Sequence, residues 1–162
     1  MIVAADAGPL IALARVQLLS LLQQLYGEVL IPPAVQQELR LGSDRPGAQR
    51  LADALQAGWL RVQALQDVSE RAALSQLIDV GEAEAILLAE QVPCRFLLID
   101  ERKGRAVAQQ RKLPIVGVAG VLLAAKTQAL IPAVRPVLAD LAALGYRFSS
   151  KLVEKVAIMA GE

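Results

Sequence analysis

The chain has 162 residues, of which 17 are lysine or arginine and 16 are aspartate or glutamate, and 55% of the residues are hydrophobic. A net charge of only +1 with this hydrophobic content excludes intrinsic disorder, and a chain of this length buries about 70% of its unfolded surface around one core. We therefore expect one domain over residues 1–162.

The first half of the chain alternates short apolar runs with helix signals. Residues 2–5 are apolar throughout, which predicts a buried strand, and Pro9 favours a helix start soon after it. The pattern then predicts a helix over 16–26 ended by Gly27, a strand over 28–31, a helix from Pro32 to about Leu39, a polar loop over 40–47, a helix over 48–57 and a short strand over 59–64.

The second half repeats this alternation and then becomes helical. It predicts helices over 70–78 and 81–91, a strand over 95–100, a helix over 101–111, a strand over 114–116, and helices over 118–127, 132–144 and 150–160. Strands that are apolar throughout and are separated by helices are typical of a parallel sheet covered on both faces. We therefore predict an α/β fold, a three-layer α/β/α sandwich with a central parallel sheet of about four to five strands and a helical C-terminus.

The residues that are missing constrain the chemistry. Histidine is absent and Cys94 is the only cysteine, so zinc sites of the His/Cys kind, Ser-His-Asp triads and Cys–His pairs cannot be assembled from this chain. Any general base or metal ligand must therefore be a carboxylate, and Cys94 is expected to be a small core residue. Aromatic residues make up only 3% of the chain, which argues against the base-stacking platforms of single-strand binders.

Carboxylates occur where a parallel sheet places its ligand site. Such sheets bind ligands beyond the carboxyl ends of their strands, and Asp6 and Asp100 each follow a predicted strand. Glu82 opens the helix before the second of these strands, and Glu38 lies on the helix after strand 28–31. Taken singly, each acid has an ordinary alternative role as a helix cap, a first-turn residue or a surface ion-pair partner.

Taken together, the four acids indicate a metal site. Two like charges about 4 Å apart repel by roughly 1 kcal/mol in water and by about 4 kcal/mol near a protein surface, so converging carboxylates need compensation. An all-oxygen site suits Mg²⁺ or Mn²⁺, and such ions hold phosphates and activate water for phosphodiester hydrolysis. The alternative is that the acids are spread over the surface.

Two neighbouring acids are weaker candidates for the same site. Glu101 directly follows Asp100, and Glu84 lies two residues after Glu82 on the same predicted helix. Positions two apart on a helix face nearly opposite sides, so we expect Glu82 to reach the cleft and Glu84 to support it from outside. Glu101 and Glu84 are additional candidate metal ligands.

Basic side chains follow Asp100 without an intervening acid after Glu101. Arg102, Lys103 and Arg105 are candidates to bind the phosphates that flank the metal site. The alternative is a solvated helix face, which is consistent with a net charge of only +1.

Several segments resemble a PIN domain. They are Asp6-Ala-Gly-Pro-Leu-Ile-Ala-Leu, Ile31-Pro-Pro-Ala-Val-Gln-Gln-Glu-Leu, Gly81-Glu-Ala-Glu-Ala-Ile-Leu-Leu-Ala and Leu98-Ile-Asp-Glu-Arg-Lys-Gly-Arg. The resemblance includes residues 116–126 and 145–150 and so extends over almost the whole chain. More narrowly, the segments resemble a prokaryotic, uncharacterised PIN-like branch that is often encoded beside small antitoxin-like partners.

The resemblance implies a metal-dependent ribonuclease with three or four acids around Mg²⁺ or Mn²⁺. Carried over by motif, these acids are Asp6, Glu38, Glu82 and Asp100. The third assignment rests on spacing, because the separation from Asp100 fits the family better for Glu82 than for Glu84. The chain departs from the common toxin pattern in having Glu at the third acid, where Asp is usual, and Ile99 before Asp100, where a polar residue is frequent. A weak, narrow or absent activity is therefore an open alternative.

Three functions follow from these observations. The first is a metal-dependent ribonuclease, the toxin component of a toxin–antitoxin pair. The second is a catalytically inactive PIN-like module that binds RNA or protein. The two functions are discriminated by whether all four acidic side chains point into one pocket. The third is a phosphatase or phosphotransfer domain, which is weakened because Gly8 stands where haloacid-type phosphatases have a second Asp and because no Walker-type loop is present.

The hydrophobic surplus predicts partners. A hydrophobic content of 55% and a mean hydropathy of +0.44 exceed what one core of this size usually needs, so we expect a homodimer and a further protein partner. The resemblance implies that the other partners are an RNA substrate and a small antitoxin protein. Two helical stripes are candidate interfaces, and the alternative for each is that it covers the sheet; they are Val121, Leu122 and Ala125, and Leu152, Val156 and Met159.

No membrane or export segment is expected. The longest stretch without a charged residue, 113–125, is shorter than the roughly 20 apolar residues that cross a bilayer. Residues 1–6 have no basic side chain before their apolar run, unlike a secretory signal, and we expect a cytoplasmic protein.

Overall fold

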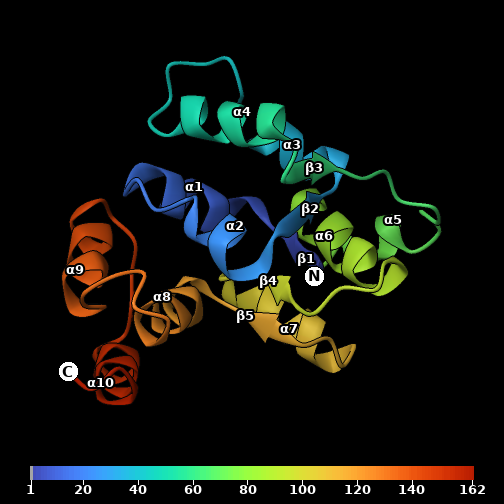
Figure 1. Cartoon of the computed structure of the whole chain (residues 1–162). Helices are drawn as coiled ribbons and strands as arrows, with labels where there is room; N and C mark the ends of the chain where they lie inside the picture. The colour runs from blue at the N-terminus through green and yellow to red at the C-terminus, as the bar shows by residue number, and fades with distance from the viewer. Residues whose placement is uncertain (1) are drawn as a thin grey trace.

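A parallel five-stranded sheet lies at the centre of the molecule (Figure 1). The computed structural model describes residues 2–162. The strands follow the order β3-β2-β1-β4-β5 and every neighbouring pair is parallel. They are β1 (Ile2–Ala5), β2 (Glu28–Ile31), β3 (Leu60–Val62), β4 (Leu97–Leu98) and β5 (Ile115–Val116).

Helices cover both faces of this sheet. They are α1 (Ala7–Arg15), α2 (Leu21–Tyr26), α3 (Pro33–Glu38), α4 (Ala48–Ala57), α5 (Arg71–Leu74), α6 (Val80–Gln91), α7 (Arg102–Gln110), α8 (Val118–Thr127), α9 (Arg135–Ala143) and α10 (Ser150–Met159). In Figure 1, α1, α2, α4 and α8 lie on one side of the strands and α5, α6 and α7 on the other. The predicted α/β/α sandwich with a parallel sheet and a helical C-terminus is confirmed.

The central strand β1 is apolar throughout because both of its faces are covered. Val3, Ala4 and Ala5 are completely buried. Ala5 pairs with Leu98 of β4, and the Asp6 N–H donates to the Leu98 carbonyl at 2.9 Å. The residues that follow β1 and β4 therefore meet at the same edge of the sheet, as predicted for Asp6 and Asp100.

Three predicted helices differ from the structure by three residues or more at one end. The helix predicted over 16–26 is wrong over its first five residues and begins only at Leu21, because Gln17 has a φ of +64° and a left-handed residue interrupts a right-handed helix. The helix predicted over 70–78 is a single turn, α5. The helix predicted from residue 132 begins at Arg135, where Pro136 occupies a first-turn position that suits its fixed φ.

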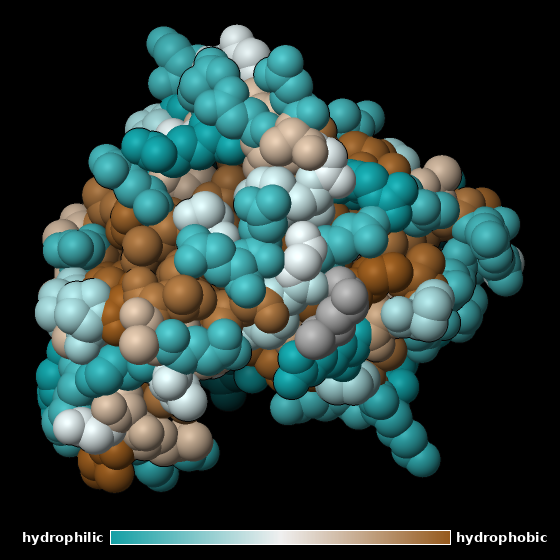
Figure 2. Space-filling model, viewed as in Figure 1, coloured by the Kyte–Doolittle hydropathy of each residue, from teal (hydrophilic) through white to brown (hydrophobic). Residues whose placement is uncertain are grey.

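The apolar stripe on α8 belongs to the core. Val121, Leu122 and Ala125 are all completely buried, so the prediction that this stripe forms an interface between chains is wrong. On α10, Val156 is buried, but Leu152 is 38% exposed and Met159 61% exposed. Figure 2 shows hydrophobic colour at the lower left of the view, the region where Figure 1 draws α10. No helix within residues 2–162 combines the length and the apolarity that a bilayer crossing requires.

A buried glutamate fastens α3 to α6. Glu84 of α6 accepts a hydrogen bond from the Ala34 N–H at 3.0 Å and forms an ion pair with Arg71 at 3.1 Å. Because Ala34 lies in the first turn of α3, Glu84 occupies the position where a helix N-terminus favours an anion. This contact sets the position of α3, whose last residue is Glu38.

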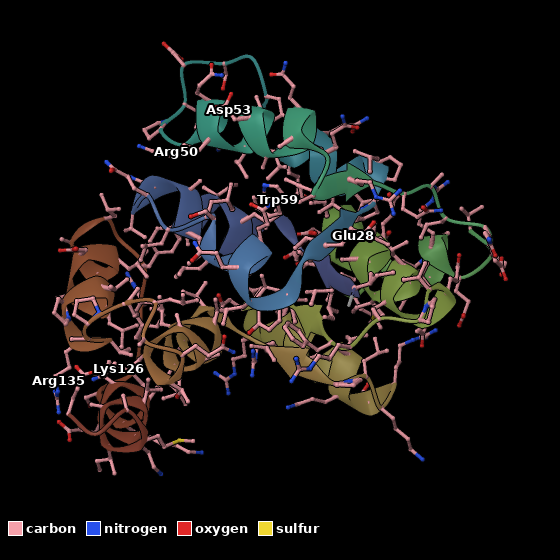
Figure 3. The ribbon with its side chains drawn as sticks, viewed as in Figure 1. Glu28, Arg50, Asp53, Trp59, Lys126 and Arg135 are labelled. Atoms are coloured by element: carbon pink, nitrogen blue, oxygen red, sulfur yellow. The ribbon has the colours of Figure 1, made fainter. Side chains whose placement is uncertain are left out.

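The last residue joins the C-terminal helices. The Glu162 carboxylate accepts hydrogen bonds from the Val134 and Arg135 N–H groups at 2.7 and 3.1 Å, and it pairs with Lys126 at 3.3 Å. Figure 3 shows Lys126 and Arg135 at the same corner of the molecule. These contacts hold α9 and α10 beside α8.

Replacing Glu84 with alanine should destabilise the protein by about 1–3 kcal/mol, because the buried Ala34 N–H loses its acceptor. Arg71→Ala should cost at most about 1 kcal/mol, since its side chain is 44% exposed and the pair is partly screened by water. Urea unfolding measures both values. Equal losses for the two variants would show that the ion pair, and not the helix contact, is the important interaction.

Candidate active site

Asp6 lies directly after β1 and its side chain is inside the protein. The residue is only 6% exposed, and its Oδ1 has no hydrogen-bond partner. Although Asp6 occupies the N-cap position of α1, its side chain makes no capping hydrogen bond. The ordinary explanation of an aspartate at this junction therefore does not account for Asp6.

Glu82 lies in the first turn of α6 and is 4% exposed. The helix begins with a capping box, in which the Glu82 N–H donates to Asp79 at 2.8 Å and the Glu82 Oε1 accepts from the Asp79 N–H at 3.4 Å. The second carboxylate oxygen, Oε2, is buried and has no partner. Sequence reasoning missed Asp79, although an acid followed three residues later by Glu before an apolar helix is a capping-box signal.

The other two predicted acids come from α3 and from the end of β4. Glu38 is half-buried at the end of α3. Asp100 follows Ile99 and accepts the Val118 N–H on both of its oxygens, at 3.2 and 3.3 Å; the residue as a whole is exposed, but these hydrogen bonds are partly buried. The N-terminus of α8 therefore holds the Asp100 carboxylate in place.

Glycines leave room for three of these carboxylates. A Cβ at Gly81 would collide with Glu38 Oε1, one at Gly104 with Glu82 Oε2, and one at Gly117 with Asp100 Oδ1. None of these three glycines has a positive φ. The structure therefore needs glycine there for space and not for backbone conformation.

The acids interact electrostatically as one group, which we call the acidic cluster: Asp6, Glu38, Asp79, Glu82 and Asp100. Burial raises the pKa of Asp6 to about 7, and the charges of Glu38, Asp79 and Asp100 add to the increase, whereas the Ala7 N–H lowers it. Burial likewise raises the pKa of Glu82 to about 8, helped by the Asp79 side chain and by the charge of Asp6.

The pKa values of Glu38 and Asp100, the other two predicted acids, are raised as well. Burial raises the pKa of Glu38, and the charge of Asp79 adds to this. Burial also raises the pKa of Asp100, but the Val118 N–H and the charge of Arg105 act against it. The cluster thus disfavours full ionisation unless a positive charge joins it.

The two weaker candidates lie outside the acidic cluster. Both oxygens of Glu84 are engaged, one by Ala34 and the other by Arg71, so neither is free to bind a metal ion. Glu101 is exposed and accepts the Lys103 N–H at 3.4 Å as the N-cap of α7.

Of the three basic candidates, one stands beside the cluster. Arg105 donates to the Ile99 carbonyl at 2.8 Å, and its charge acts on Asp100. Arg102 and Lys103 are exposed on α7.

A groove of about 680 Å³ opens beside the acidic cluster, and we call it the α8–α10 groove. Its wall contains Asp100 and Arg105 near the cluster, residues of α8 and α10, and the segment Tyr146–Phe148 between α9 and α10. Gly8, two residues after Asp6, also lines it. An extended ligand in this groove would therefore pass Asp100, the one acid of the cluster that lines it.

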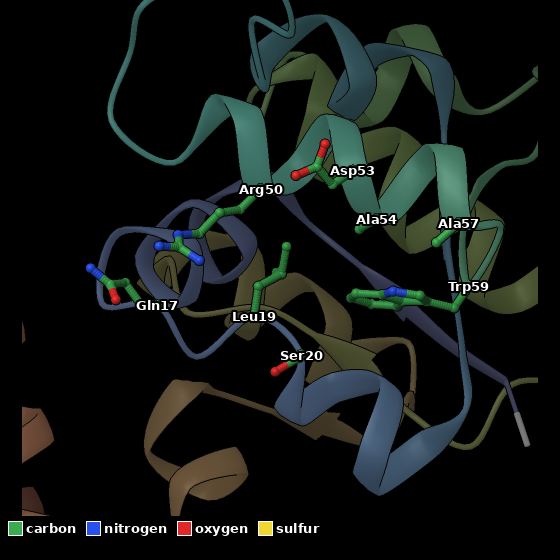
Figure 4. A pocket seen from close by; sticks show the side chains of 8 residues that line it. All are labelled: Gln17, Leu19, Ser20, Arg50, Asp53, Ala54, Ala57 and Trp59. Carbon is green, nitrogen blue, oxygen red and sulfur yellow. The ribbon is translucent and has the colours of Figure 1, made fainter.

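A second pocket, of about 280 Å³, lies elsewhere (Figure 4). Trp59 forms one side of it, Arg50 and Asp53 of α4 lie above it, and the turn between α1 and α2 completes it. None of its lining residues belongs to the acidic cluster.

Acids that lie at the carboxyl edge of a parallel sheet, next to an open groove, occupy the position where open α/β sheets bind their ligands. The family model that matches residues 2–162 is described as a PIN domain. The chain belongs to the PIN-domain family, whose members are generally nucleases and typically use divalent metal ions. No curated protein and no solved structure matches the chain significantly.

The donor atoms of the cluster suit a hard divalent cation. All are carboxylate oxygens, and two of them, Asp6 Oδ1 and Glu82 Oε2, are buried without a partner, as expected of groups that bind an ion. However, within residues 2–162 the structure contains no group of three or more Asp, Glu or Cys side chains that could hold a metal ion in their present positions. The donor set therefore fits the cation in its chemistry, and binding would require the carboxylates to draw together.

Without a bound cation, the protein should lose stability as the pH rises. Asp6 and Glu82 bind protons more tightly in the folded protein than in the unfolded chain, so their contribution is fully present below their ordinary values of 3.8 and 4.5 and is lost as the pH passes about 7 and about 8. Unfolding in EDTA, followed from pH 5 upward, measures this loss. The lowered pKa values of Asp67 and Glu162 act below that range.

The variants Asp6→Asn and Glu82→Gln should each make this pH dependence flatter. The matched control is Asp140→Asn, which removes an exposed carboxylate of α9 and should leave the slope unchanged. A wild-type stability that rises between neutral and mildly alkaline pH would contradict the electrostatic description of the cluster.

Proposed function

We propose that the protein is a metal-dependent ribonuclease that hydrolyses phosphodiester bonds of RNA. The observation that carries the proposal is the pair of buried, partnerless carboxylate oxygens, Asp6 Oδ1 and Glu82 Oε2, in a member of a family of nucleases. A stability requirement alone would favour removing such groups, because burying an unpaired polar atom costs about 1–3 kcal/mol.

The residues proposed to hold Mg²⁺ or Mn²⁺ are Asp6, Glu38, Glu82 and Asp100. When bound, such an ion polarises a phosphate oxygen and lowers the pKa of a water molecule that attacks phosphorus. Asp79 orients Glu82 through the capping box, and Val118 holds Asp100 through its N–H. Arg105, which lines the groove beside Asp100, would bind a phosphate that flanks the scissile bond.

Protons and metal ions would compete for the same oxygens. Because the pKa of Asp6 lies at about 7 and that of Glu82 at about 8, both carboxylates retain protons near neutrality in the absence of a cation. Metal binding must release these protons, so affinity should increase with pH. Activity that increases from mildly acidic to mildly alkaline pH is the corresponding expectation.

The second candidate function is a catalytically inactive module that binds RNA or protein. The observation in its favour is that, across residues 2–162, no three carboxylates are arranged so that they could hold a metal ion. In that case the acidic cluster would be a remnant of the family's site, and the α8–α10 groove alone would carry the function.

Asp6→Asn should reduce cleavage of structured RNAs by about a hundredfold or more, the effect expected when a preorganised charged group is lost. Pure protein is incubated with RNA in Mn²⁺, in Mg²⁺ and in EDTA, and only the first two should support cleavage by the wild type. The variant should be as stable as the wild type or more stable, because it relieves repulsion within the cluster.

Asp140→Asn serves as the control and should cleave at the wild-type rate. Cleavage by Asp6→Asn at that same rate would exclude the proposed mechanism. RNA binding without cleavage in either metal would favour the inactive module.

We also propose that the protein is the toxin component of a pair, that it forms a homodimer and that it binds a small antitoxin protein. Support for the dimer comes from α10, where Ile158 is 71% exposed and Met159 is 61% exposed. Light scattering over a dilution series should give twice the monomer mass, and Ile158→Lys should reduce it to the monomer mass. A monomer at every micromolar concentration of the wild type would contradict the dimer.

A further inference from the structure

The α8–α10 groove contains an unusual share of the chain's aromatic side chains. The chain has only five aromatic residues, two Phe, two Tyr and one Trp. Tyr26 and Phe96 pack edge to face in the core with their ring centroids 4.9 Å apart, and Trp59 lines the other pocket. The remaining two, Tyr146 and Phe148, both line the groove and are half-buried.

The segment that carries these two rings is held at both ends. The Tyr146 N–H donates to the Leu141 carbonyl at 3.1 Å, which ties the segment to α9. On the other side, Ser149 caps α10 by accepting the Leu152 N–H at 3.0 Å. The guanidinium of Arg15 lies over the Tyr146 ring, 5.8 Å from its centroid. The backbone of the segment and the Tyr146 ring are therefore held in place.

Positive charges accompany the rings along the groove. Arg147 stands between them in the sequence and Lys155 lies on α10, and both line the groove. Neither has an ion-pair or hydrogen-bond partner through its side chain in the part of the chain that the structure describes, and both are exposed. Arg105 adds a third cation where the groove reaches Asp100.

We propose that Tyr146 and Phe148 form a base-stacking subsite for unpaired RNA, with Arg147 and Lys155 binding the adjacent phosphates. This inference rests on the proposed function and names its substrate class, a single-stranded segment. Flat rings offer contact to the faces of bases, which are accessible in an unpaired strand but are covered by neighbours in a duplex. Unpaired cations beside the rings complement the phosphates, whereas an apolar peptide would leave them without partners.

The subsite would also set the register of cleavage. The two rings line the same groove as Asp100 and Arg105, so a base stacked on the rings would fix which phosphate reaches Asp100. The site of cleavage would then lie at a constant distance from the stacked base.

The direct test measures RNA binding in EDTA, where no hydrolysis occurs and no metal ion contributes. The probe is a fluorescent single-stranded RNA of about ten nucleotides, within the range that single-strand-binding modules cover. Tyr146→Leu and Phe148→Leu should each weaken binding by about fivefold to a hundredfold, the loss expected when one stacked base loses its ring. Binding to the same backbone without bases should be weak for the wild type and unchanged in both variants.

Two control variants distinguish the loss of a stacking ring from the loss of any aromatic side chain and from the loss of a positive charge. Trp59→Leu removes an aromatic ring that lines the other pocket and should leave RNA binding unchanged. Lys155→Gln should weaken binding to the RNA and to the base-free backbone alike and should reduce the salt dependence, because it removes a phosphate contact.

A second measurement uses the unaltered protein, so that a folding defect in a variant cannot obscure the result. RNA carrying 5-iodouridine, which crosslinks to aromatic rings stacked on it, should form its photochemical crosslink with Tyr146 or Phe148 on irradiation. A crosslink located by mass spectrometry on Trp59 or Tyr26 instead would overturn the proposal.

The outcomes distinguish this inference from the ribonuclease proposal. Metal-dependent cleavage by the wild type, together with unchanged RNA binding by both ring variants, would refute the subsite and leave the ribonuclease intact. Failure of the wild type to bind the single strand would refute the subsite whether or not RNA is cleaved. Ring variants that dissociate a dimer but bind RNA normally would show that a second copy of the chain occupies the groove.

Discussion

The burial of Asp6 and Glu82 at the edge of the sheet is the constraint on which the rest of the structure depends. Inside the protein, water cannot hydrate their charges, and burial raises the pKa of both side chains. The fold must therefore supply enough stability elsewhere to keep these groups where they are. It does so with a continuous apolar core, in which the central strand β1 is buried on both faces. The buried acids thus lower the free energy of unfolding, and the apolar core raises it.

Each acid of the site is positioned by a different connection of the chain. Asp6 follows β1 directly, and Asp100 follows β4, which pairs with β1. Glu38 depends on α3, which Glu84 fastens to α6, and Glu82 depends on the capping box at the start of α6. The parallel order of the strands brings these connections to one edge, so residues far apart in sequence form one electrostatic unit.

The sequence was sufficient to predict the features that depend on local pattern. Apolar runs followed by an acid indicated Asp6 and Asp100 at neighbouring strand ends, since a run without alternation means a strand covered on both faces. Features that depend on which surfaces meet could not be predicted in the same way. The stripe on α8 is apolar whether it faces its own sheet or another chain, and only the structure shows that Val121 is completely buried. Likewise, a low aromatic content said nothing of where Tyr146 and Phe148 would lie.

The three glycines beside the acids have a consequence for how mutations in this protein are interpreted. A methyl group at Gly81 or Gly117 would meet first the end of a carboxylate side chain, an atom that can move aside while the backbone keeps its path, whereas one at Gly104 would also lie 2.7 Å from the buried Ile99 side chain. A substitution at Gly81 or Gly117 would displace a carboxylate oxygen yet leave folding nearly intact. In a screen for loss of function, positions without any side chain would therefore rank beside the acids themselves. Positions that are sensitive to mutation would therefore include residues that leave room for the carboxylates, and not only the carboxylates themselves.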